Sequence, residues 1–338
     1  MLLIYKLFFI AIIILFSRSV YVFVFSAPSL LERFESSTGS ISNIAEQKSK
    51  LPLFEYCIKS SYNTALDKNN TVSVDTVKSV LSNGCRFLDF ELFYVDKVVE
   101  VATSADKYNY TTITSKNAIS LNDVFKCIIA SAFSAPSPNP SDPLFIQLRV
   151  QAKDPVIYNE IGKIVDKYLS GLLFVGKVDG NTILKTLSNK IVLIIDITLS
   201  PSYAKMSHYP ECVRNDNGEM VQSPTCFHLS KYINIESGSQ RLSTFSYGNM
   251  QRQATTPLVV ATSNTPMTKT LLLRIIVPDD INENKNPNSS KYILEYGVQF
   301  ILNRFYIKDT ALKEYEEIFT KNNSAFVPFA DCLYSIEK

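Results

Sequence analysis

The chain has 338 residues, of which 46% are hydrophobic and 20% are charged, and 34 Lys and Arg residues balance 32 Asp and Glu residues. This composition excludes an intrinsically disordered chain, which would be poorer in apolar residues and less balanced in charge. The net charge of +2 argues against binding through bulk positive charge, so no nucleic-acid partner is expected. With only two histidines, His208 and His228, the chain has few imidazoles for acid–base chemistry.

Residues 1–27 are strongly apolar, and two interpretations of them remain open. Residues 7–25 are just long enough for a membrane anchor, in which Arg18 would cost about 2.5–3.5 kcal/mol if central. A cleaved signal peptide would instead use Lys6 as its positive charge and end at the small residue Ala27. A buried core helix is less favoured because no face of the segment is polar. Either membrane interpretation predicts an anchored or secreted protein outside the cytosol.

Residues 28–50 are rich in Ser, Glu and Lys and are predicted to form a linker. After it, short apolar runs alternate with amphipathic stretches, a pattern typical of parallel strands and covering helices. In chain order the predicted elements are a strand at 54–59, a helix at 74–82, strands at 86–92 and 97–102, a helix at 121–133, a strand at 144–150, helices at 155–169 and 182–188, strands at 190–198 and 271–277, a helical turn at 292–296, a strand at 298–305 and a helix at 311–320.

Local signals mark the ends of several of these helices. Asn83-Gly84 is typical of a helix C-cap, Ser120 of an N-cap, and Pro155 of a first helical turn. Residues 190–198 form a near-continuous apolar run, as expected of a strand that is buried on both faces.

The number and order of the elements predict an α/β fold, a (β/α)8 TIM-like barrel over residues 51–338. Residues 199–257 are long, polar and irregular, and are predicted to be an insertion at the barrel mouth, where loops that follow barrel strands lie. A doubly wound open sheet is the alternative, but no glycine-rich phosphate loop follows any strand.

The six cysteines fall into two kinds of sequence. Cys57, Cys85 and Cys127 lie in apolar segments and are predicted to be buried free thiols. The polar stretch at 199–257 contains the set His208, Cys212, Cys226 and His228. Two Cys and two His can hold zinc, Cys212 and Cys226 can form a disulfide, and all four can be unbonded loop residues. One of the histidines could also supply a catalytic imidazole.

Several strings resemble the phosphatidylinositol-specific phospholipase C family. FEYCIKSSYNTA at 54–65 and VSVDTVKSVLSNGCRFL at 72–88 are similar to the start of its X region. LLLRIIVP at 271–278, GVQFILN at 297–303 and AFVP at 325–328 are similar to its Y region. The resemblance covers about residues 51–328 and implies a phospholipase-C-like barrel, to which the apolar residues 1–27 add an N-terminal hydrophobic helix. The same features also resemble phospholipase-C-like proteins of large DNA viruses, which would imply a location in the virion.

The family's chemistry implies a set of site residues. Its members use two histidines for proton transfer, and eukaryotic members add Ca²⁺ held by Asn and carboxylates. Tyr62 stands at the place of the first histidine, and Asn63 is retained as a metal ligand. Asp89 and Glu91 stand where the family has Glu-x-Asp, in reversed order. Because they are two residues apart on a strand, their side chains share a face and could hold a hard cation such as Ca²⁺ or Mg²⁺.

Other positions depart further from the family. Residues 98–110 contain no second histidine, and Arg149 stands where the next acidic residue is expected. On 190–198 the lysines of the family are absent and Asp196 is present. Arg149 could bind phosphate in place of a metal, or pair with Asp89 or Glu91.

Three functions remain open on this basis. The leading one is an inactive phospholipase-C-like barrel that acts as a binding or structural module for a phospholipid headgroup or a protein partner. The second is an active divergent phosphatidylinositol phospholipase C, a phosphoric diester hydrolase, which uses Asn63, Asp89 and Glu91 with calcium or another divalent ion. The third is a surface adaptor stabilised by zinc.

Overall fold

The computed structural model describes residues 40–106, 112–198, 203, 227–253, 272–279 and 283–336. Contacts between residues separate 1–38 from a compact unit at 39–338, and all described residues belong to the second unit. The predicted anchor or signal segment at 1–27 lies outside the described residues. Within the described part, no helix is both long and apolar enough to cross a bilayer.

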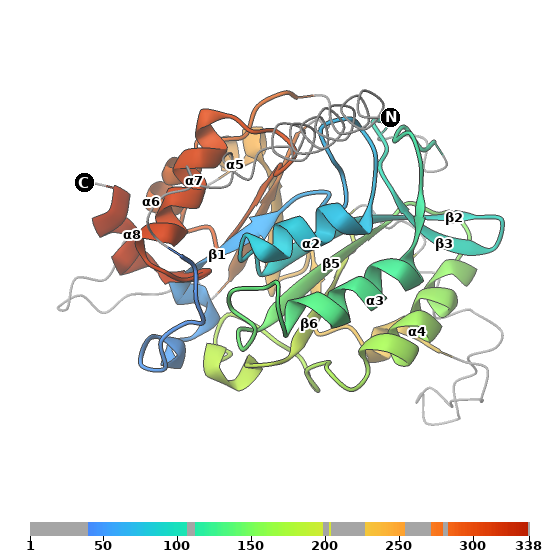
Figure 1. Ribbon diagram of the computed structural model, residues 1–338, viewed down its shortest axis with the longest axis horizontal. Helices are drawn as coiled ribbons and strands as arrows, with labels where there is room; N and C mark the ends of the chain where they lie inside the picture. The colour runs from blue at the N-terminus through green and yellow to red at the C-terminus, as the bar shows by residue number, and fades with distance from the viewer. Residues whose placement is uncertain are drawn as a thin grey trace, which may run out of the picture. The chain divides into compact units, whose positions relative to one another are not determined.

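Eight parallel strands form a closed ring in the order β1, β2, β5, β6, β7, β8, β9 and β10, and β1 closes it by pairing with both β10 and β2 (Figure 1). The predicted (β/α)8 barrel is therefore confirmed. The ring strands are β1 (Tyr56–Ser61), β2 (Phe87–Val95), β5 (Leu144–Val150), β6 (Ile191–Asp196), β7 (Ile235–Ser237), β8 (Leu242–Ser246), β9 (Leu273–Val277) and β10 (Phe300–Asn303).

Three further strands extend the sheet outside the ring. β3 (Val98–Ala102) pairs antiparallel with β2, and β4 (Ile119–Ser120) pairs antiparallel with β3. β11 (Phe326–Pro328) pairs antiparallel with the first half of β1, at residues 56–58. These pairings leave the barrel itself wholly parallel.

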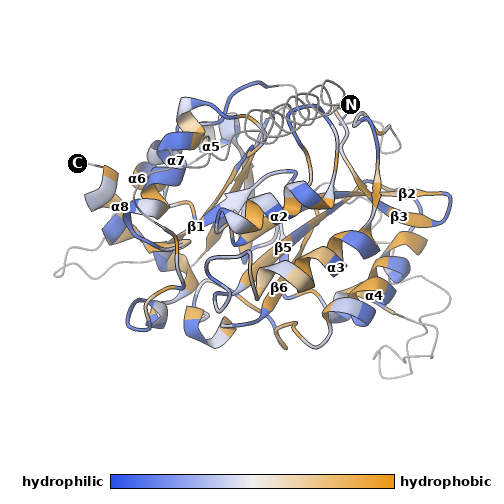
Figure 2. Cartoon of the chain, in the orientation of Figure 1, coloured by the Kyte–Doolittle hydropathy of each residue, from blue (hydrophilic) through white to orange (hydrophobic). Residues whose placement is uncertain are grey.

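Helices cover the ring (Figure 1) and carry both apolar and polar residues (Figure 2), and the residues that they bury are mostly apolar. The α-helices are α2 (Val74–Ser82), α3 (Leu121–Ala132), α4 (Val156–Leu169), α5 (Tyr247–Gln253), α6 (Ser289–Tyr296), α7 (Thr310–Lys321) and α8 (Phe329–Ile336). Short 3₁₀ helices are η1 (Lys48–Lys50), η2 (Leu53–Glu55), η3 (Leu184–Leu187) and η5 (Leu229–Lys231).

The predicted helix caps are present. The Ser120 side chain accepts a hydrogen bond from the Asn122 amide at the start of α3. Asn83 is the C-cap of α2, and Gly84 follows it with a φ of 76°, in the left-handed region that favours glycine. A Cβ atom at Gly84 would also lie 2.7 Å from Cγ2 of Ile41, so this position requires glycine for two reasons.

Two predicted regions need correction. The stretch at 199–257 contains η5 and the ring strands β7 and β8, so it is wrong to regard all of it as an irregular insertion. These strands are short and polar, and they are held by pairing with their neighbours rather than by an apolar run of their own. The predicted linker at 28–50 is too long, because Ile41 is buried and Ser42 bridges to Ser324.

The barrel interior changes character along the strands, because alternate side chains of a strand point inward. Phe87 of β2 is in register with Phe145 of β5, and both rings pack on Phe300 of β10, with ring centroids 4.8 and 5.5 Å away. Farther toward the carboxyl ends, polar residues replace the aromatic ones. Glu91 is then in register with Arg149. The aromatic layer closes the floor beneath a charged upper layer.

Outside the barrel, a buried polar network joins the residues before β2 to the loop after α3. The Arg86 guanidinium is fully buried and donates to the Ala132 carbonyl and to Ser137 Oγ. Asp142 is also buried and accepts hydrogen bonds from the Ile44 amide and the Asn139 side chain. This network ties residue 44, which lies in the predicted linker, to the barrel.

The Asp142 carboxyl predicts a pH dependence of stability. Burial raises its pKa from 3.8 to about 6, against the lowering effect of the Ile44 amide and of Arg86. Between about pH 4 and pH 6 the folded protein therefore holds a proton that the unfolded chain releases, so the free energy of unfolding should fall by about 2–3 kcal/mol as the pH rises through that window. Urea denaturation at several pH values should show that this fall in the free energy of unfolding is absent in Asp142→Asn. The same slope in Asp142→Asn and wild type would contradict the prediction, and Asp123→Asn, an exposed position, is the matched control.

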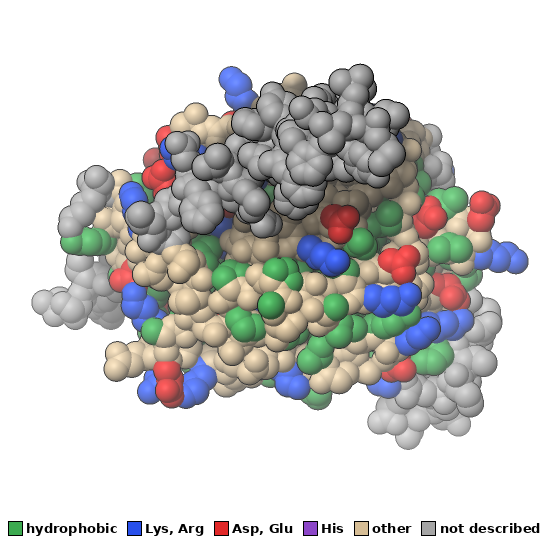
Figure 3. Space-filling model, viewed as in Figure 1, with side chains coloured by type: hydrophobic (Ala, Val, Ile, Leu, Met, Phe, Trp, Pro, Cys, Tyr) green, Lys and Arg blue, Asp and Glu red, His purple; other side chains and the backbone are tan. Residues whose placement is uncertain are grey.

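The face formed by α2 and α3 carries interspersed Lys, Arg, Asp and Glu side chains between uncharged ones (Figure 3). This mixture agrees with the near-balanced charge of the chain.

Candidate functional site

The predicted site residues come together at the carboxyl ends of the ring strands. Tyr62 and Asn63 follow β1, Asp89 and Glu91 lie on β2, and Arg149 lies near the end of β5. All five side chains are at most 8% exposed. In parallel barrels this end carries the functional residues, because the loops that differ between proteins surround it.

Arg149 and Asp89 form a two-pronged ion pair. Arg149 Nε lies 2.9 Å from Asp89 Oδ1, and Arg149 Nη2 lies 3.0 Å from Asp89 Oδ2. The same Nη2 donates to the side-chain oxygen Oδ1 of Asn63, and the backbone N–H of Asn63 donates to Asp89 Oδ2. This planar geometry is the one that a guanidinium makes best with a carboxylate. Of the two predicted roles of Arg149, the geometry therefore shows pairing with the acidic residues.

Glu91 is the second carboxylate on this face of β2. Its Oε2 lies 3.6 Å from Arg149 Nη1 and accepts a hydrogen bond from the Ser104 amide, and its Oε1 accepts one from Gln151 Nε2. Burial raises the pKa of Glu91, and the nearby Arg149 charge counteracts this in part. Asp89 and Glu91 both contact Arg149, so they share a face, as their spacing predicts.

Tyr62 covers Arg149 at the place of the family's first histidine. The centroid of its ring lies 4.6 Å from Arg149 Cζ, a cation–π arrangement. Burial raises the pKa of the Tyr62 phenol well above its usual value, although Arg149 opposes the rise. The phenol therefore keeps its proton at neutral pH and is a poor general base.

A cavity of about 360 Å³, here called the mouth cavity, opens above these residues. Its lining includes Tyr62, Glu91, Arg149, Gln151, Asp196 and Asp279. Asp196 ends β6 and is fully buried, and its Oδ1 accepts hydrogen bonds from the amide and the hydroxyl of Thr198. Burial raises the pKa of Asp196. Asp106 lies there too, so the described residues contribute four carboxylates to the mouth cavity.

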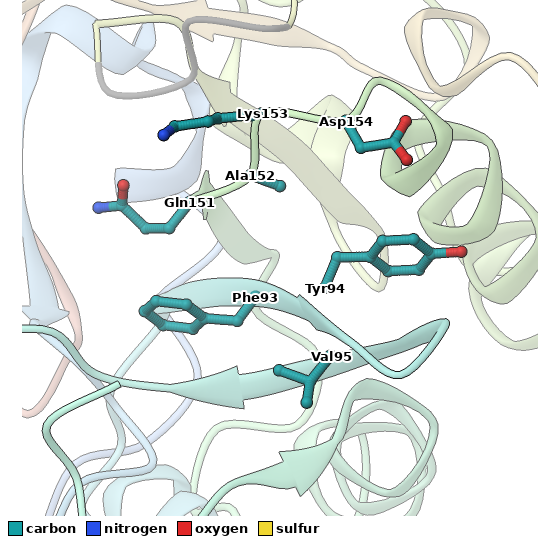
Figure 4. A pocket seen from close by; sticks show the side chains of 7 residues that line it. All are labelled: Phe93, Tyr94, Val95, Gln151, Ala152, Lys153 and Asp154. Carbon is teal, nitrogen blue, oxygen red and sulfur yellow. The ribbon is translucent and has the colours of Figure 1, made fainter. Parts of the chain in front are cut away.

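A second cavity of about 200 Å³ lies beside the mouth cavity, between residues 93–95 of β2 and residues 151–154 after β5. Gln151 lines both cavities. Figure 4 shows that Gln151 and Phe93 point to one side, whereas Tyr94 points to the other. This cavity holds none of the predicted site residues.

The residues present do not fit the calcium ion that the resemblance implies. The Arg149 guanidinium contacts both oxygens of Asp89 and the side-chain oxygen of Asn63, which are three of the implied ligand atoms. A divalent cation would meet this positive charge at its own binding oxygens. Among the described residues, moreover, no three His, Cys, Asp or Glu side chains are grouped so that they could hold a metal ion.

The remaining predicted residues have different outcomes. His208, Cys212 and Cys226 lie outside the described residues, so the zinc and disulfide predictions stay predictions. His228 is described just before η5, with its Nδ1 2.6 Å from Ser230 Oγ. The predicted burial of Cys57, Cys85 and Cys127 as free thiols is confirmed, and Cys332 is a fourth buried thiol.

Sequence reasoning missed the two glutamines of this site. Gln147 donates to Asp89 Oδ1 over 3.3 Å, and Gln151 Nε2 donates to Glu91 Oε1. The alternation of side chains from Arg149 along β5 was the signal that could have found them, because residues 147, 149 and 151 share a face.

Comparison with known proteins supports the resemblance over the first half of the barrel. Residues 49–196 match the family model of the phosphatidylinositol-specific phospholipase C X domain. The match covers less than half of the chain, and it agrees with the resemblance of residues 54–65 and 72–88 to the X region. No curated protein sequence matches this phospholipase-C-like chain significantly.

Two solved structures show the same barrel. PLC21 from L. pealei is 16% identical, with a TM-score of 0.57 over 83% of this chain and 37% of its own. PLC21 from S. officinalis is also 16% identical, with a TM-score of 0.57 over 86% of this chain and 38% of its own. The phospholipase-C-like chain thus spans a little over a third of the length of these proteins, and at this identity the likeness shows the fold alone.

Proposed function

We propose that this chain is a phospholipase-C-like barrel without phosphodiesterase activity, which serves as a binding module. The observation that carries the proposal is that the Arg149 guanidinium donates hydrogen bonds to the side-chain oxygens of Asp89 and Asn63. Arg149 Nε and Nη2 donate to Asp89 and Asn63, and Nη1 lies 3.6 Å from Glu91 Oε2, so Arg149 has few donors left for a phosphate group. Arg149 and Asp89 therefore form an ion pair in the position where the family carries out its chemistry.

Proton transfer is the second requirement of the family's reaction, and the described residues supply it poorly. Tyr62 keeps its proton, and no histidine is among the described residues that line the mouth cavity. Glu91 and Asp196 have raised pKa values, which favours the alternative of a divergent hydrolase that uses carboxyl groups. An anionic phosphodiester would, however, meet four carboxylates in this cavity, which opposes its binding.

The location and partners form a further part of the proposal. The apolar segment at 7–25 supports a module that is anchored in a membrane or secreted, where a phospholipid headgroup or a protein partner would be available. This part rests on the sequence alone, and mass spectrometry of the mature N-terminus would distinguish the anchor from the cleaved signal peptide.

A turnover assay tests the proposed loss of activity. The full chain should release no product from phosphatidylinositol or from glycerophosphodiesters, with excess Ca²⁺, with excess Mg²⁺ or with EDTA. Turnover that disappears in Glu91→Gln, while circular dichroism shows an intact fold, would overturn the proposal. Asp123→Asn, far from the mouth cavity on the exposed face of α3, is the matched control for a change of one carboxylate.

A further inference from the structure

The charge of the mouth cavity is the first observation that points to a ligand. Glu91, Asp106, Asp196 and Asp279 contribute carboxylates, and Arg149 is the one cationic side chain among the described residues of the lining. The charge of Arg149 is already neutralised by Asp89, which lies behind it and outside the lining. Among the described residues, the lining of the cavity therefore carries more carboxylates than cations, which favours a cationic occupant.

The second, independent observation is a pair of buried acceptors that lack partners. Asp196 is 0% exposed, and both Thr198 hydrogen bonds fall on its Oδ1, so that Oδ2 has no donor among the described residues. Gln151 is 7% exposed, and within the described part of the chain its Oε1 also has no donor, while its Nε2 donates to Glu91 Oε1. Because Glu91 fixes the orientation of this amide, the free atom is the acceptor. A buried polar atom without a hydrogen bond is energetically costly, so a ligand that donates to Asp196 Oδ2 and Gln151 Oε1 would be favoured.

The size and the remaining lining indicate what kind of cation fits. A cavity of about 360 Å³ is far larger than a single metal ion requires, and no metal-binding group of three was found among the described residues. The hydroxyls of Ser104, Thr198 and Ser246 line one part of it, and Phe245 and Val277 supply apolar surface. This mixture suits a small organic molecule with an aliphatic or hydroxylated body and a charged N–H donor.

We propose that the mouth cavity binds a primary ammonium group on a short aliphatic or hydroxylated chain, with Asp196 Oδ2 and Gln151 Oε1 as its acceptors. This inference rests on the proposed function, since it names the ligand class of a barrel mouth that no longer holds a phosphodiester. The ammonium group could come from a free amine or from the headgroup of an aminophospholipid, because both present the same three donors.

The test uses the full chain and 1,4-diaminobutane as the probe, followed by isothermal titration calorimetry. The diamine should bind to wild type, and the neutral isostere 1,4-butanediol should not. Asp196→Asn keeps the acceptor for Thr198 but removes the charge and the free acceptor, so it should weaken binding by about tenfold or more. Asp123→Asn should bind like wild type. Thermal unfolding of both variants checks that they fold.

Two comparisons decide between the outcomes. Vesicles of phosphatidylcholine with and without phosphatidylethanolamine separate a lipid source from a free amine, and Asp196-dependent binding in either form supports the inference. Equal binding by wild type and folded Asp196→Asn, binding to neither source, or a preference for myo-inositol 1-phosphate over the diamine would overturn it. The turnover assay is separate: hydrolysis of phosphatidylinositol would defeat the proposed function, whereas failure to bind amines without hydrolysis would defeat this inference alone.

Discussion

Replacing Arg149 by methionine is expected to lower the free energy of unfolding by about 3–5 kcal/mol. Methionine keeps much of the length of the side chain, but it leaves Asp89 fully buried without its cationic partner and removes a donor from Asn63. A buried carboxylate that loses its counter-ion must either stay charged in an apolar setting or take up a proton, and both are costly. Urea denaturation followed by circular dichroism measures the change.

A double variant separates the lost pair from lost packing. The double variant Asp89→Asn with Arg149→Met has no unpaired charge. Its loss of free energy of unfolding should therefore be smaller than the sum of the losses in the two single variants. Arg241→Met, at an exposed position, should change stability by no more than about 0.5 kcal/mol. A loss below about 1 kcal/mol in Arg149→Met would show that the ion pair contributes little, contrary to its geometry.

Replacing Arg149 by glutamate is expected to make the stability of the protein depend on calcium. The resemblance implies an acidic residue at this position, and with it Asp89, Glu91 and Asn63 would offer the hard oxygen ligands that calcium takes. Without the ion, three carboxylates would repel one another at one buried point, and the variant should unfold at a lower temperature than wild type. Saturating Ca²⁺, at about 100 times its Kd, should restore about 2.7 kcal/mol.

Thermal unfolding with Ca²⁺ and with EDTA checks this expectation, and the variant should be purified with calcium throughout. Arg149→Gln is the matched control, because it removes the cation without supplying a third carboxylate and should show little response to calcium. If wild type were stabilised by Ca²⁺ as strongly as Arg149→Glu, the idea that Arg149 stands in place of the metal would be wrong. Absence of any response in Arg149→Glu would show that the ligand geometry is lost altogether.

Much of the local structure follows from the sequence. The helix predicted at 74–82 and the strand predicted at 144–150 have the observed bounds, because the first ends at Asn83-Gly84 and the second is a short apolar run. The barrel class followed from the alternation of strands and helices and from the resemblance of 54–65 and 72–88 to the X region. The strands β7 and β8 escaped prediction, since they are short and polar and depend on β6 and β9 for their pairing.

The sequence by itself determined which chemical groups occupy the family's positions: a phenol at 62, an amide at 63, carboxylates at 89 and 91, and a guanidinium at 149. Tertiary structure alone decided what they do to one another. Arg149 and Asp89 are 60 residues apart in the chain and meet because β2 and β5 pair in parallel, with Glu91 opposite Arg149. Spacing along one strand predicts which side chains share a face, but contact across strands depends on register and closure of the barrel. The same closure buries Asp196 beside this group, where no described residue donates to its Oδ2.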